Sequence, residues 1–308
     1  MIVLVTGGSG LIGKAIESIK NNYEYDFIFL SSSDCDLTDF NKTKELFNKI
    51  KPDYVIHLAA NVGGLFKNMN QKVDMFEKNL LINYNVIKCC HDFKIKKLIS
   101  CLSTCIFPND TTYPINESML HNGAPHNSND AYSYAKRMIE VHSKAYREQY
   151  NNNFVCVIPT NVYGEYDNFS LEDGHVVPAL IHKCYLAKQN NKPFVVYGSG
   201  KPLRQFIYST DLAKLILWVL ENYTGEPIIL SPNESDEVSI KNVAELIAKE
   251  FNYDNIKFDT SKSDGQFKKT ADNTKLIDLY GEFKFTTIED GIKKSVNWFM
   301  NNYKIARK

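Results

Sequence analysis

Residues 2–13 read Ile2-Val3-Leu4-Val5-Thr6-Gly7-Gly8-Ser9-Gly10-Leu11-Ile12-Gly13. A short apolar run, typical of a buried strand, leads directly into glycines with GxxGxxG spacing and then into a helical pattern. The first glycine permits a tight turn, the second lets the backbone approach a pyrophosphate, and the third lets the helix pack closely on the strand. The helix N-terminus also faces the anion. We therefore expect residues 7–13 to form a dinucleotide-binding turn.

The alternation of strand and helix continues over the first 160 residues and predicts an α/β fold. Its core is expected to be a doubly wound parallel sheet of the Rossmann type. The expected strands are 2–6, 26–30, 53–58, 96–101 and 154–158, and the expected helices are 11–22, 38–50, 68–92 and 131–150. Ligands should bind at the carboxyl ends of these strands, near the switch point of the sheet.

The segments beyond residue 160 suit a smaller, discontinuous α/β lobe that binds substrate. Loops rich in Gly, Pro and Asn separate helical patterns near 175–190, 210–222, 239–251 and 287–303. The run from Gln205 to Tyr208, followed by a helical pattern, resembles a strand and helix that return to the first lobe. We expect an NADP-binding domain of residues 1–160 and about 203–230, and a substrate-binding domain of about 161–202 and 231–308.

Composition excludes several classes of partner. The 308 residues include 36 Lys and Arg and 36 Asp and Glu, so the net charge of zero provides no global field for nucleic acid or an anionic membrane. The seven cysteines form neither a CxxC metal pattern nor an obvious disulfide framework, which favours reduced thiols. The N-terminal run lacks the features of a signal peptide, and no apolar run is long enough for a membrane span. A cytoplasmic protein without a metal is expected.

The end of the second strand indicates which dinucleotide is preferred. It reads Leu30-Ser31-Ser32-Ser33, where an NAD site usually has an acidic residue for the ribose 2′-hydroxyl. Hydroxyls and backbone amides would accept a 2′-phosphate that a carboxylate would repel, so NADP(H) is favoured. The arginine of a strong 2′-phosphate site is absent, and Asp36-Leu37 is an alternative contact for the adenine.

Tyr132 and Lys136 lie four residues apart on a predicted helix and therefore share a face. An ammonium one turn away stabilises a phenolate and should lower the pKa of Tyr132. Tyr132 would then protonate a nascent alkoxide, and Lys136 would also donate to the nicotinamide ribose. Ser103, at the end of a predicted strand, would provide a second hydrogen bond to the carbonyl oxygen.

The order of these motifs resembles that of the extended short-chain dehydrogenase/reductase family, and the resemblance covers nearly the whole chain. Two further motifs that carry this resemblance are His57-Leu58-Ala59-Ala60 and Pro159-Thr160-Asn161-Val162-Tyr163-Gly164. The resemblance implies NADP(H) contacts from Lys136, His175 and the four residues Pro159, Thr160, Asn161 and Val162.

Three further stretches, at residues 100–108, 173–178 and 263–269, narrow the resemblance. They are similar to those of family members that epimerise a GDP-linked 4-keto-6-deoxy sugar at C3 and C5 and then reduce C4. This resemblance implies a role for Cys105 and His175 in epimerisation, a homodimer formed by helices around 70–92 and 131–150, and nucleotide-sugar contacts from Lys183, Tyr197, Arg204, Asp264 and Lys269. The preference for GDP rests on the resemblance alone.

The chemistry of Cys105 and His175 can also be argued from the residues. Carbons 3 and 5 both flank the C4 ketone, so enolate formation acidifies their protons, and inversion needs a base on one face and an acid on the other. Cys105, two residues from Ser103, is a plausible base and His175 a plausible acid. The alternatives are that Cys105 is a small buried apolar residue and that His175 is structural.

Three functions remain open at this point. The first is the epimerase-reductase, the second an NAD-dependent nucleotide-sugar epimerase that regenerates its cofactor, and the third a cofactor-sensing Rossmann protein without catalysis. Thr104-Cys105 stands where sugar-nucleotide dehydratases of the family tend to have an acidic pair, which argues against a dehydratase. For the dimer, Leu80, Leu81, Ile87 and Met138 would line the seam or pack on the sheet.

Overall fold

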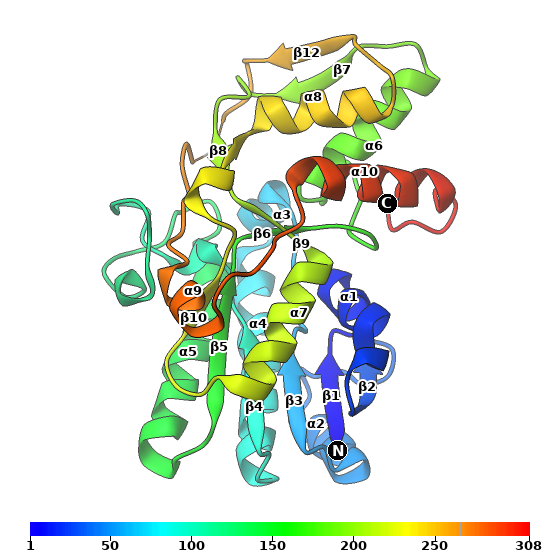
Figure 1. The fold of residues 1–308 in the computed structure, drawn as a ribbon. Helices are drawn as coiled ribbons and strands as arrows, with labels where there is room; N and C mark the ends of the chain where they lie inside the picture. The colour runs from blue at the N-terminus through cyan, green and yellow to red at the C-terminus, as the bar shows by residue number, and fades with distance from the viewer. Residues whose placement is uncertain (265) are drawn as a thin grey trace.

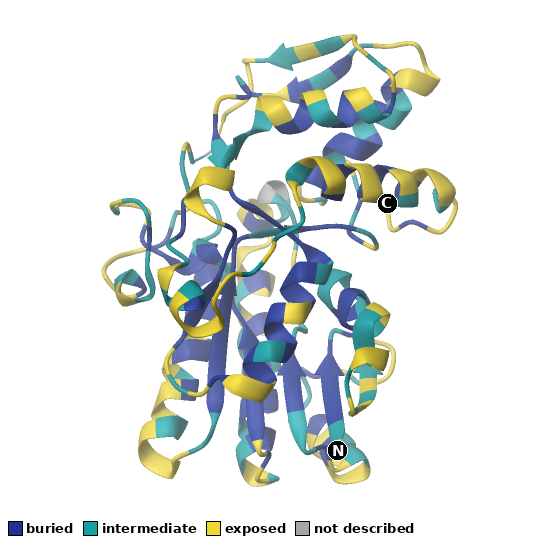
Figure 2. Cartoon of the chain, viewed as in Figure 1, coloured by how far each residue is buried: buried dark blue, intermediate teal, exposed yellow. Residues whose placement is uncertain are grey.

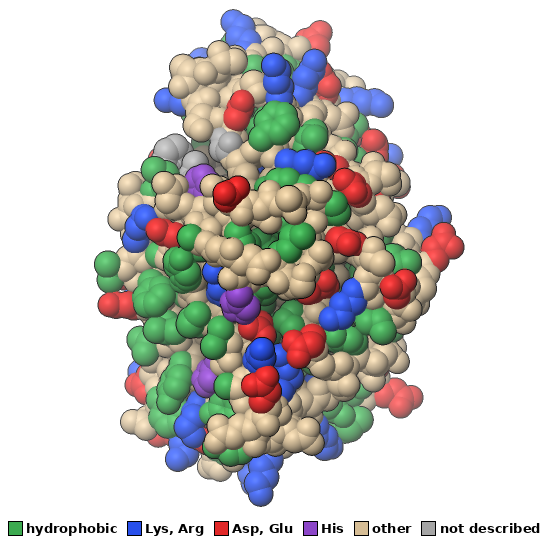
Figure 3. Space-filling view, turned by 90° about the vertical axis from the view of Figure 1, so that its left-hand side faces the viewer, with side chains coloured by type: hydrophobic (Ala, Val, Ile, Leu, Met, Phe, Trp, Pro, Cys, Tyr) green, Lys and Arg blue, Asp and Glu red, His purple; other side chains and the backbone are tan. Residues whose placement is uncertain are grey.

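The computed structural model describes residues 1–264 and 266–308, with the side chains of Leu65 and Phe66 excepted. A larger part is built around a central sheet and contains the N-terminus, and a smaller part above it carries the C-terminal helix (Figure 1). Positive and negative side chains are interspersed on the face shown in Figure 3, in keeping with the net charge of zero.

Six parallel strands form the central sheet in the order β10-β5-β4-β3-β1-β2. Their bounds are β1 Ile2–Thr6, β2 Asp26–Leu30, β3 Tyr54–His57, β4 Lys97–Cys101, β5 Phe154–Pro159 and β10 Ile228–Leu230. The five predicted strands are confirmed to within one residue at each end, whereas β10 was not predicted. The chain runs from β1 to β2 on one side and then crosses to β3 on the other, so the switch point lies beside β1.

Helices cover both faces of this sheet, which explains why its strands are apolar on both sides (Figure 2). Helices α2, α4 and α5 pack on one face, and α1 and α7 pack on the other. The bounds in this part are α1 Leu11–Ile19, η1 Lys20–Asn22, α2 Phe40–Ile50, α3 Leu65–Asn70, α4 Lys72–Asp92, α5 Asp130–Tyr150 and α7 Ser209–Asn222.

Two predicted helices differ from the structure. The helix expected over 11–22 ends at Ile19 and continues as a 3-10 turn. The helix expected over 68–92 is interrupted at Gln71, whose backbone (φ −123°, ψ 43°) leaves the helical region and separates α3 from α4. Periodicity did not reveal this break because Gln71 is neither a glycine nor a proline.

The smaller part packs three helices and a two-stranded parallel sheet around its own apolar core. The helical patterns expected near 175–190, 239–251 and 287–303 are confirmed as α6, α8 and α10, and that near 210–222 as α7. The remaining bounds are α6 Val176–Gln189, β7 Phe194–Tyr197, β8 Leu203–Arg204, η4 Glu234–Asp236, β11 Val238–Ser239, α8 Ile240–Glu250, β12 Ile256–Asp259, α9 Thr274–Tyr280 and α10 Ile288–Asn301.

The chain leaves and re-enters the larger part along paired segments. Strands β6 (Asn161–Tyr163) and β9 (Phe206–Tyr208) pair in parallel, directly after β5 and directly before α7. Two 3-10 turns, η2 (Thr104–Ile106) and η3 (Glu117–Met119), follow β4, and Ile115 forms a bridge with Ala271. Segments distant in sequence therefore meet above the carboxyl ends of the strands.

Across the described residues, no helix combines the length and the apolar character that crossing a lipid bilayer would require.

Candidate functional site

The glycine-rich turn joins β1 to α1 and has the geometry of a dinucleotide cradle. Gly7 has φ +71°, a conformation that side chains disfavour, and a Cβ there would lie 2.8 Å from Ala59 N. A Cβ on Gly13 would lie 2.5 Å from Gly8 O, so only glycine lets α1 pack this closely on the turn. Gly10 is the N-cap of α1 and provides no side-chain cap, which leaves the first amides of the helix available to an anion. The structure thus brings together Gly7, Gly8, Ser9, Gly10, Leu11, Ile12 and Gly13.

The turn after β2 contains a carboxylate that the sequence analysis did not consider. Asp34 Oδ2 accepts hydrogen bonds from Ser31 N (2.8 Å) and Ser31 Oγ (2.6 Å), and these bonds lower the pKa of Asp34. Ser31 Oγ also lies 2.7 Å from Ser33 Oγ. The serine hydroxyls are therefore organised by a charged group three residues downstream. Leu37 is buried in the core, and Asp36 Oδ1 accepts hydrogen bonds from Thr38 N (3.0 Å) and Thr38 Oγ1 (2.7 Å), so the adenine contact of this pair stays a prediction.

The residues after β5 line the same edge of the sheet. Thr160 N donates to Leu230 O at 3.4 Å, and Asn161 donates through N and Nδ2 to Gln205 O at 3.2 and 3.0 Å. The buried Thr160 Oγ1 has no hydrogen-bond partner within the described residues. Pro159 ends β5, and Val162 is half-buried in β6. An unpaired buried hydroxyl at this edge fits a site that a polar ligand completes.

Tyr132 and Lys136 occupy the first turns of α5 and share a face, as predicted. Lys136 Nζ donates to Cys101 O at 2.8 Å and lies 5.9 Å from the centre of the Tyr132 ring. Burial raises the pKa of Tyr132 well above its usual value, with smaller contributions from Cys105 and Cys101, and burial lowers the pKa of Lys136. The pKa of Tyr132 is therefore raised, and not lowered as expected from Lys136, because desolvation is the largest cause of its shift. Tyr132 is accordingly a neutral phenol that can donate a proton.

Ser103 and Cys105 lie on one turn at the carboxyl end of β4. Ser103 is the N-cap of η2, and its Oγ lies 3.5 Å from Cys105 N. Both side chains are half-buried. A serine that can polarise a carbonyl and a thiol that can act on the neighbouring carbon are thus presented together.

Arg137, which follows Lys136 on α5, forms hydrogen bonds with the end of this turn. Its Nε donates to Ile106 O at 3.0 Å, its Nη2 donates to the same oxygen, and its Nη1 donates to Gly123 O at 2.8 Å. Sequence reasoning overlooked Arg137, although its position next to Lys136 was an available signal.

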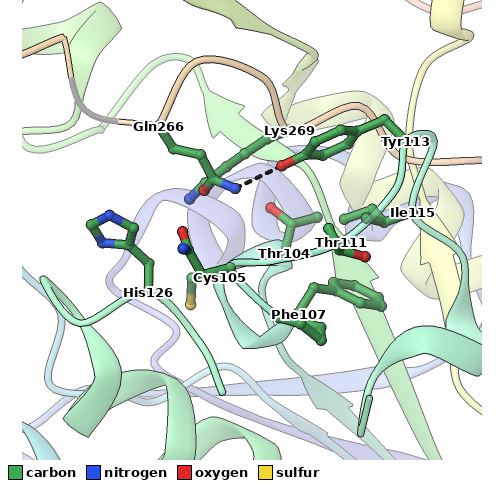
Figure 4. A pocket seen from close by; sticks show the side chains of 11 residues that line it. Thr104, Cys105, Phe107, Thr111, Tyr113, Ile115, His126, Gln266 and Lys269 are labelled. Carbon is green, nitrogen blue, oxygen red and sulfur yellow. Dashed lines mark hydrogen bonds between the residues drawn. The ribbon is translucent and has the colours of Figure 1, made fainter. Parts of the chain in front are cut away.

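A pocket opens beside Cys105, and Figure 4 shows the side chains that line it. In this view His126 lies to the left of Cys105, and Gln266 and Lys269 lie above it. Gln266 Nε2 donates to Tyr113 Oη at 2.7 Å. Burial lowers the pKa of Lys269, Cys105 opposes this change, and Arg204 adds to it. Of the sequence-predicted residues, the structure brings Cys105 and Lys269 together here. His126, Gln266 and Tyr113 were missed because they come from loops without periodicity.

His175 lies at the N-cap of α6 and is not part of the pocket lining in the described structure. Its side chain is 57% exposed, and its Nδ1 lies 3.9 Å from Oδ1 of the buried Asp167. The Asp167 carboxylate raises the pKa of His175, while the charge of Arg307 acts in the opposite direction. The structure therefore provides His175 with a partner that the sequence analysis missed.

The other predicted substrate residues lie near the pocket, in the case of Arg204, or in the smaller part, in the case of Lys183, Tyr197 and Asp264. Arg204 donates to Leu203 O and Gln266 O, both at 2.6 Å, so it lies beside the segment that leads to Lys269. Lys183 Nζ lies 3.6 Å from the centre of the exposed Tyr197 ring, at the edge of the smaller part. Asp264 accepts from Ser199 N (2.6 Å) and Ser199 Oγ (2.7 Å), so both carboxylate oxygens are engaged. Gly265, in one of the stretches that carried the resemblance, lies outside the described residues.

Known proteins resemble this chain over its full length. The profile of the NAD dependent epimerase/dehydratase family matches residues 3–230. The chain belongs to this family. A curated member, the GDP-L-fucose synthase of Dictyostelium discoideum, is 55% identical over 311 residues that cover 99% of this chain and 97% of that protein. A probable GDP-L-fucose synthase of Drosophila melanogaster is 50% identical over 318 residues, which cover 99% of each chain.

A solved structure from this family has the same fold over the full chain. The crystal structure of a GDP-L-fucose synthetase from Naegleria fowleri bound to NADP superposes with a TM-score of 0.95 and 52% sequence identity. The superposition covers 100% of this chain and 95% of that one. The predicted α/β fold with a doubly wound parallel sheet is confirmed.

Proposed function

We propose that this protein is a bifunctional NADPH-dependent epimerase-reductase that converts GDP-4-keto-6-deoxy-D-mannose to GDP-L-fucose. The observation that carries the proposal is the single turn bearing Ser103 and Cys105, facing the helix that bears Tyr132 and Lys136. Relatives named GDP-L-fucose synthase that are 55% and 50% identical over nearly the whole chain support this reading.

NADP(H) is the cofactor of this function. The glycine cradle at residues 7–13, the serine turn after β2 and the unpaired Thr160 hydroxyl fit a phosphorylated dinucleotide. The Naegleria relative with NADP bound supports the same choice. We assign Lys136, His175 and residues 159–162 to this site. Bound NADPH supplies the hydride that reduces the C4 ketone.

Epimerisation uses Cys105 as the base and His175 as the acid. The Cys105 thiolate takes the proton from the carbon beside the ketone, and His175 returns a proton to the opposite face. Arg137 and Lys269 place positive charge near the thiol. Ser103 and Tyr132 donate hydrogen bonds to the ketone oxygen, where negative charge develops.

Reduction uses the same hydrogen bonds to the ketone oxygen. Tyr132 donates its phenolic proton to the alkoxide at O4, and its raised pKa keeps the phenol protonated until the alkoxide forms. Lys136 fixes the first turns of α5 through Cys101 O. The same ammonium would donate to the ribose of a bound nicotinamide cofactor.

The nucleotide part of the substrate is held by cations above the sheet. The charge of Arg204 lowers the pKa of Lys269, so the two cations lie near each other and suit a diphosphate. We assign Lys183, Tyr197 and Asp264 to the more distant part of the nucleotide sugar. The domain boundaries stated above and a cytoplasmic location belong to the same proposal.

A homodimer formed by α4 and α5 also belongs to the proposal. The two helices pack together, and Leu81 and Met138 on them are 46% and 37% exposed. Leu80 is half-buried, and Ile87 is fully buried in the core and so takes no part in the seam. A second copy of the chain would cover the exposed apolar side chains.

The test is incubation with the 4-keto sugar and NADPH in deuterated water. The wild-type enzyme should oxidise one NADPH for each sugar and place deuterium at C3 and C5, both visible by NMR. Cys105→Ser should slow this exchange by roughly 100-fold or more while NADPH binding, followed by fluorescence, stays unchanged. The other half-buried cysteine, Cys35 in the loop after β2, provides the control variant Cys35→Ser.

Two outcomes would contradict the proposal. If Cys105→Ser retains the exchange, the thiol is not the base. If the sugar is converted while NADPH stays constant, the enzyme is a nucleotide-sugar epimerase that regenerates its cofactor.

A further inference from the structure

Asp167 is a buried carboxylate whose hydrogen bonds are incomplete. Its side chain is 3% exposed. Among the described residues, Oδ1 accepts one hydrogen bond, from Asn168 N at 2.7 Å, and Oδ2 accepts none. Burying a carboxylate is unfavourable unless a charge or several donors stabilise it. Packing alone therefore does not explain this residue.

The cationic partner of Asp167 is His175. Its Nδ1 lies 3.9 Å from Asp167 Oδ1, and no ion pair of Asp167 with any other described residue is present. The two nitrogens of an imidazole point in diverging directions, so an Nδ1 turned to Asp167 leaves Nε2 for a ligand. The His175 side chain is 57% exposed, which gives Nε2 access to a substrate.

The loop that carries both residues is fixed at several points. The Tyr166 ring packs 4.7 Å from Trp298, the Phe169 ring packs 4.5 Å from Phe299, and Phe169 N donates to Arg307 O at 2.7 Å. Gly174 N donates to Ser170 O at 3.0 Å and closes a turn. A Cβ on Gly174 would lie 2.4 Å from the same oxygen, so this turn needs a glycine. Asp167 is thus held between two aromatic anchors, and His175 is returned to it.

We propose that Asp167 is a positioning residue that pairs with His175 Nδ1 and directs Nε2 of the imidazolium toward the substrate as the proton donor of epimerisation. The inference rests on the function proposed above. In each inversion Cys105 takes a proton from carbon, His175 Nε2 gives one to the opposite face, and exchange with solvent restores both groups. The pKa of His175 is raised by Asp167, so the imidazolium that this step needs is favoured.

The variant Asp167→Asn tests this proposal, because it removes the charge of the side chain and keeps its shape. NMR titration of labelled histidine, assigned with His175→Gln, should show a lower pKa for His175, because the raising effect of the Asp167 carboxylate is lost and the charge of Arg307 then acts unopposed. The alkaline limb of deuterium exchange at C3 and C5 should move to lower pH by the same amount. At pH values above the pKa of His175, the rate of deuterium exchange should fall about tenfold for each pH unit.

Asp173→Asn is the matched control, since Asp173 lies on the same loop with an exposed carboxylate. It should leave the His175 titration and the exchange profile unchanged. If His175 titrates alike in Asp167→Asn and wild type, the proposal is overturned, even where activity and melting temperature fall together. The NMR titration needs no turnover, so a wild-type enzyme that incorporates no deuterium counts against the proposed function and not against the pairing.

Discussion

His57 connects the cofactor strand to the helix that carries the reductase residues. Thr6 Oγ1 accepts from Leu58 N and Ala59 N, both at 3.2 Å, so its own hydrogen points to His57 Nδ1 at 2.8 Å. His57 Nε2 therefore carries the ring hydrogen and donates to Asn83 Oδ1 at 3.0 Å. Asn83 in turn donates to Ala135 O, between Tyr132 and Lys136 on α5, at 3.4 Å. A neutral imidazole is the form of His57 that satisfies this series of hydrogen bonds.

This assignment predicts how stability depends on pH. Burial lowers the pKa of His57 from 6.5 to about 3, so the unfolded state binds a proton that the native state does not between these values. His57 should therefore lower the free energy of unfolding by about 1.4 kcal/mol for each unit that the pH falls below about 6. Urea unfolding at pH values of about 4.5, 5.5, 6.5 and 7.5 measures this slope.

The variant for comparison is His57→Gln, whose amide can accept from Thr6 and donate to Asn83 without titrating. It should show a smaller dependence on pH over the same window. Equal slopes for the two proteins would mean that other groups dominate the acid loss of stability.

At the scale of elements, α5 controls the turn that carries the thiol. Three donors of Arg137 meet two backbone carbonyls, Ile106 O at the end of η2 and Gly123 O in the following loop. Buried carbonyls without donors are unfavourable by roughly 1–3 kcal/mol each. The same helix therefore positions Tyr132 by its own geometry and Cys105 through Arg137.

Arg137→Lys tests this coupling. A lysine keeps the charge but cannot reach both carbonyls in the fork geometry of arginine. We expect deuterium exchange at C3 and C5 to slow roughly tenfold, about 1.4 kcal/mol in the barrier, while NADPH affinity remains near that of wild type. Arg147→Lys, further along α5, is the control. A parallel fall in NADPH affinity would instead indicate a general distortion of α5.

At the scale of the whole molecule, the proposed dimer can be tested by placing charges on α4 and α5. The double variant Leu81→Lys with Met138→Lys should shift the protein from dimer to monomer in sedimentation velocity at micromolar concentration, because like charges would then face each other across the seam. Leu279→Lys with Ile305→Lys changes two exposed apolar residues elsewhere and should leave the mass unchanged. A monomeric wild-type protein would contradict the dimer directly.

Much of the fold was predictable because it depends on local spacing. The strand before Gly7 and the helix after Gly13 follow from a run of apolar residues and three glycines. Strand β10 was missed because its pairing with β5 lies 71 residues away in the register Ile228 with Val157. The break at Gln71 was missed because it has no strong sequence marker.

The sequence by itself determined the dinucleotide turn, the shared face of Tyr132 and Lys136, and the place of Ser103 and Cys105 at the end of one strand. Helical and strand periods fix these relations over a few residues. Only the tertiary structure decided that Arg137 supports the thiol turn 31 residues before it, that Gln266 meets Tyr113 across 153 residues, and that Asp167 is buried behind His175. Such contacts depend on how distant segments pack, and the burial that reversed the expected pKa change of Tyr132 exists only once they do.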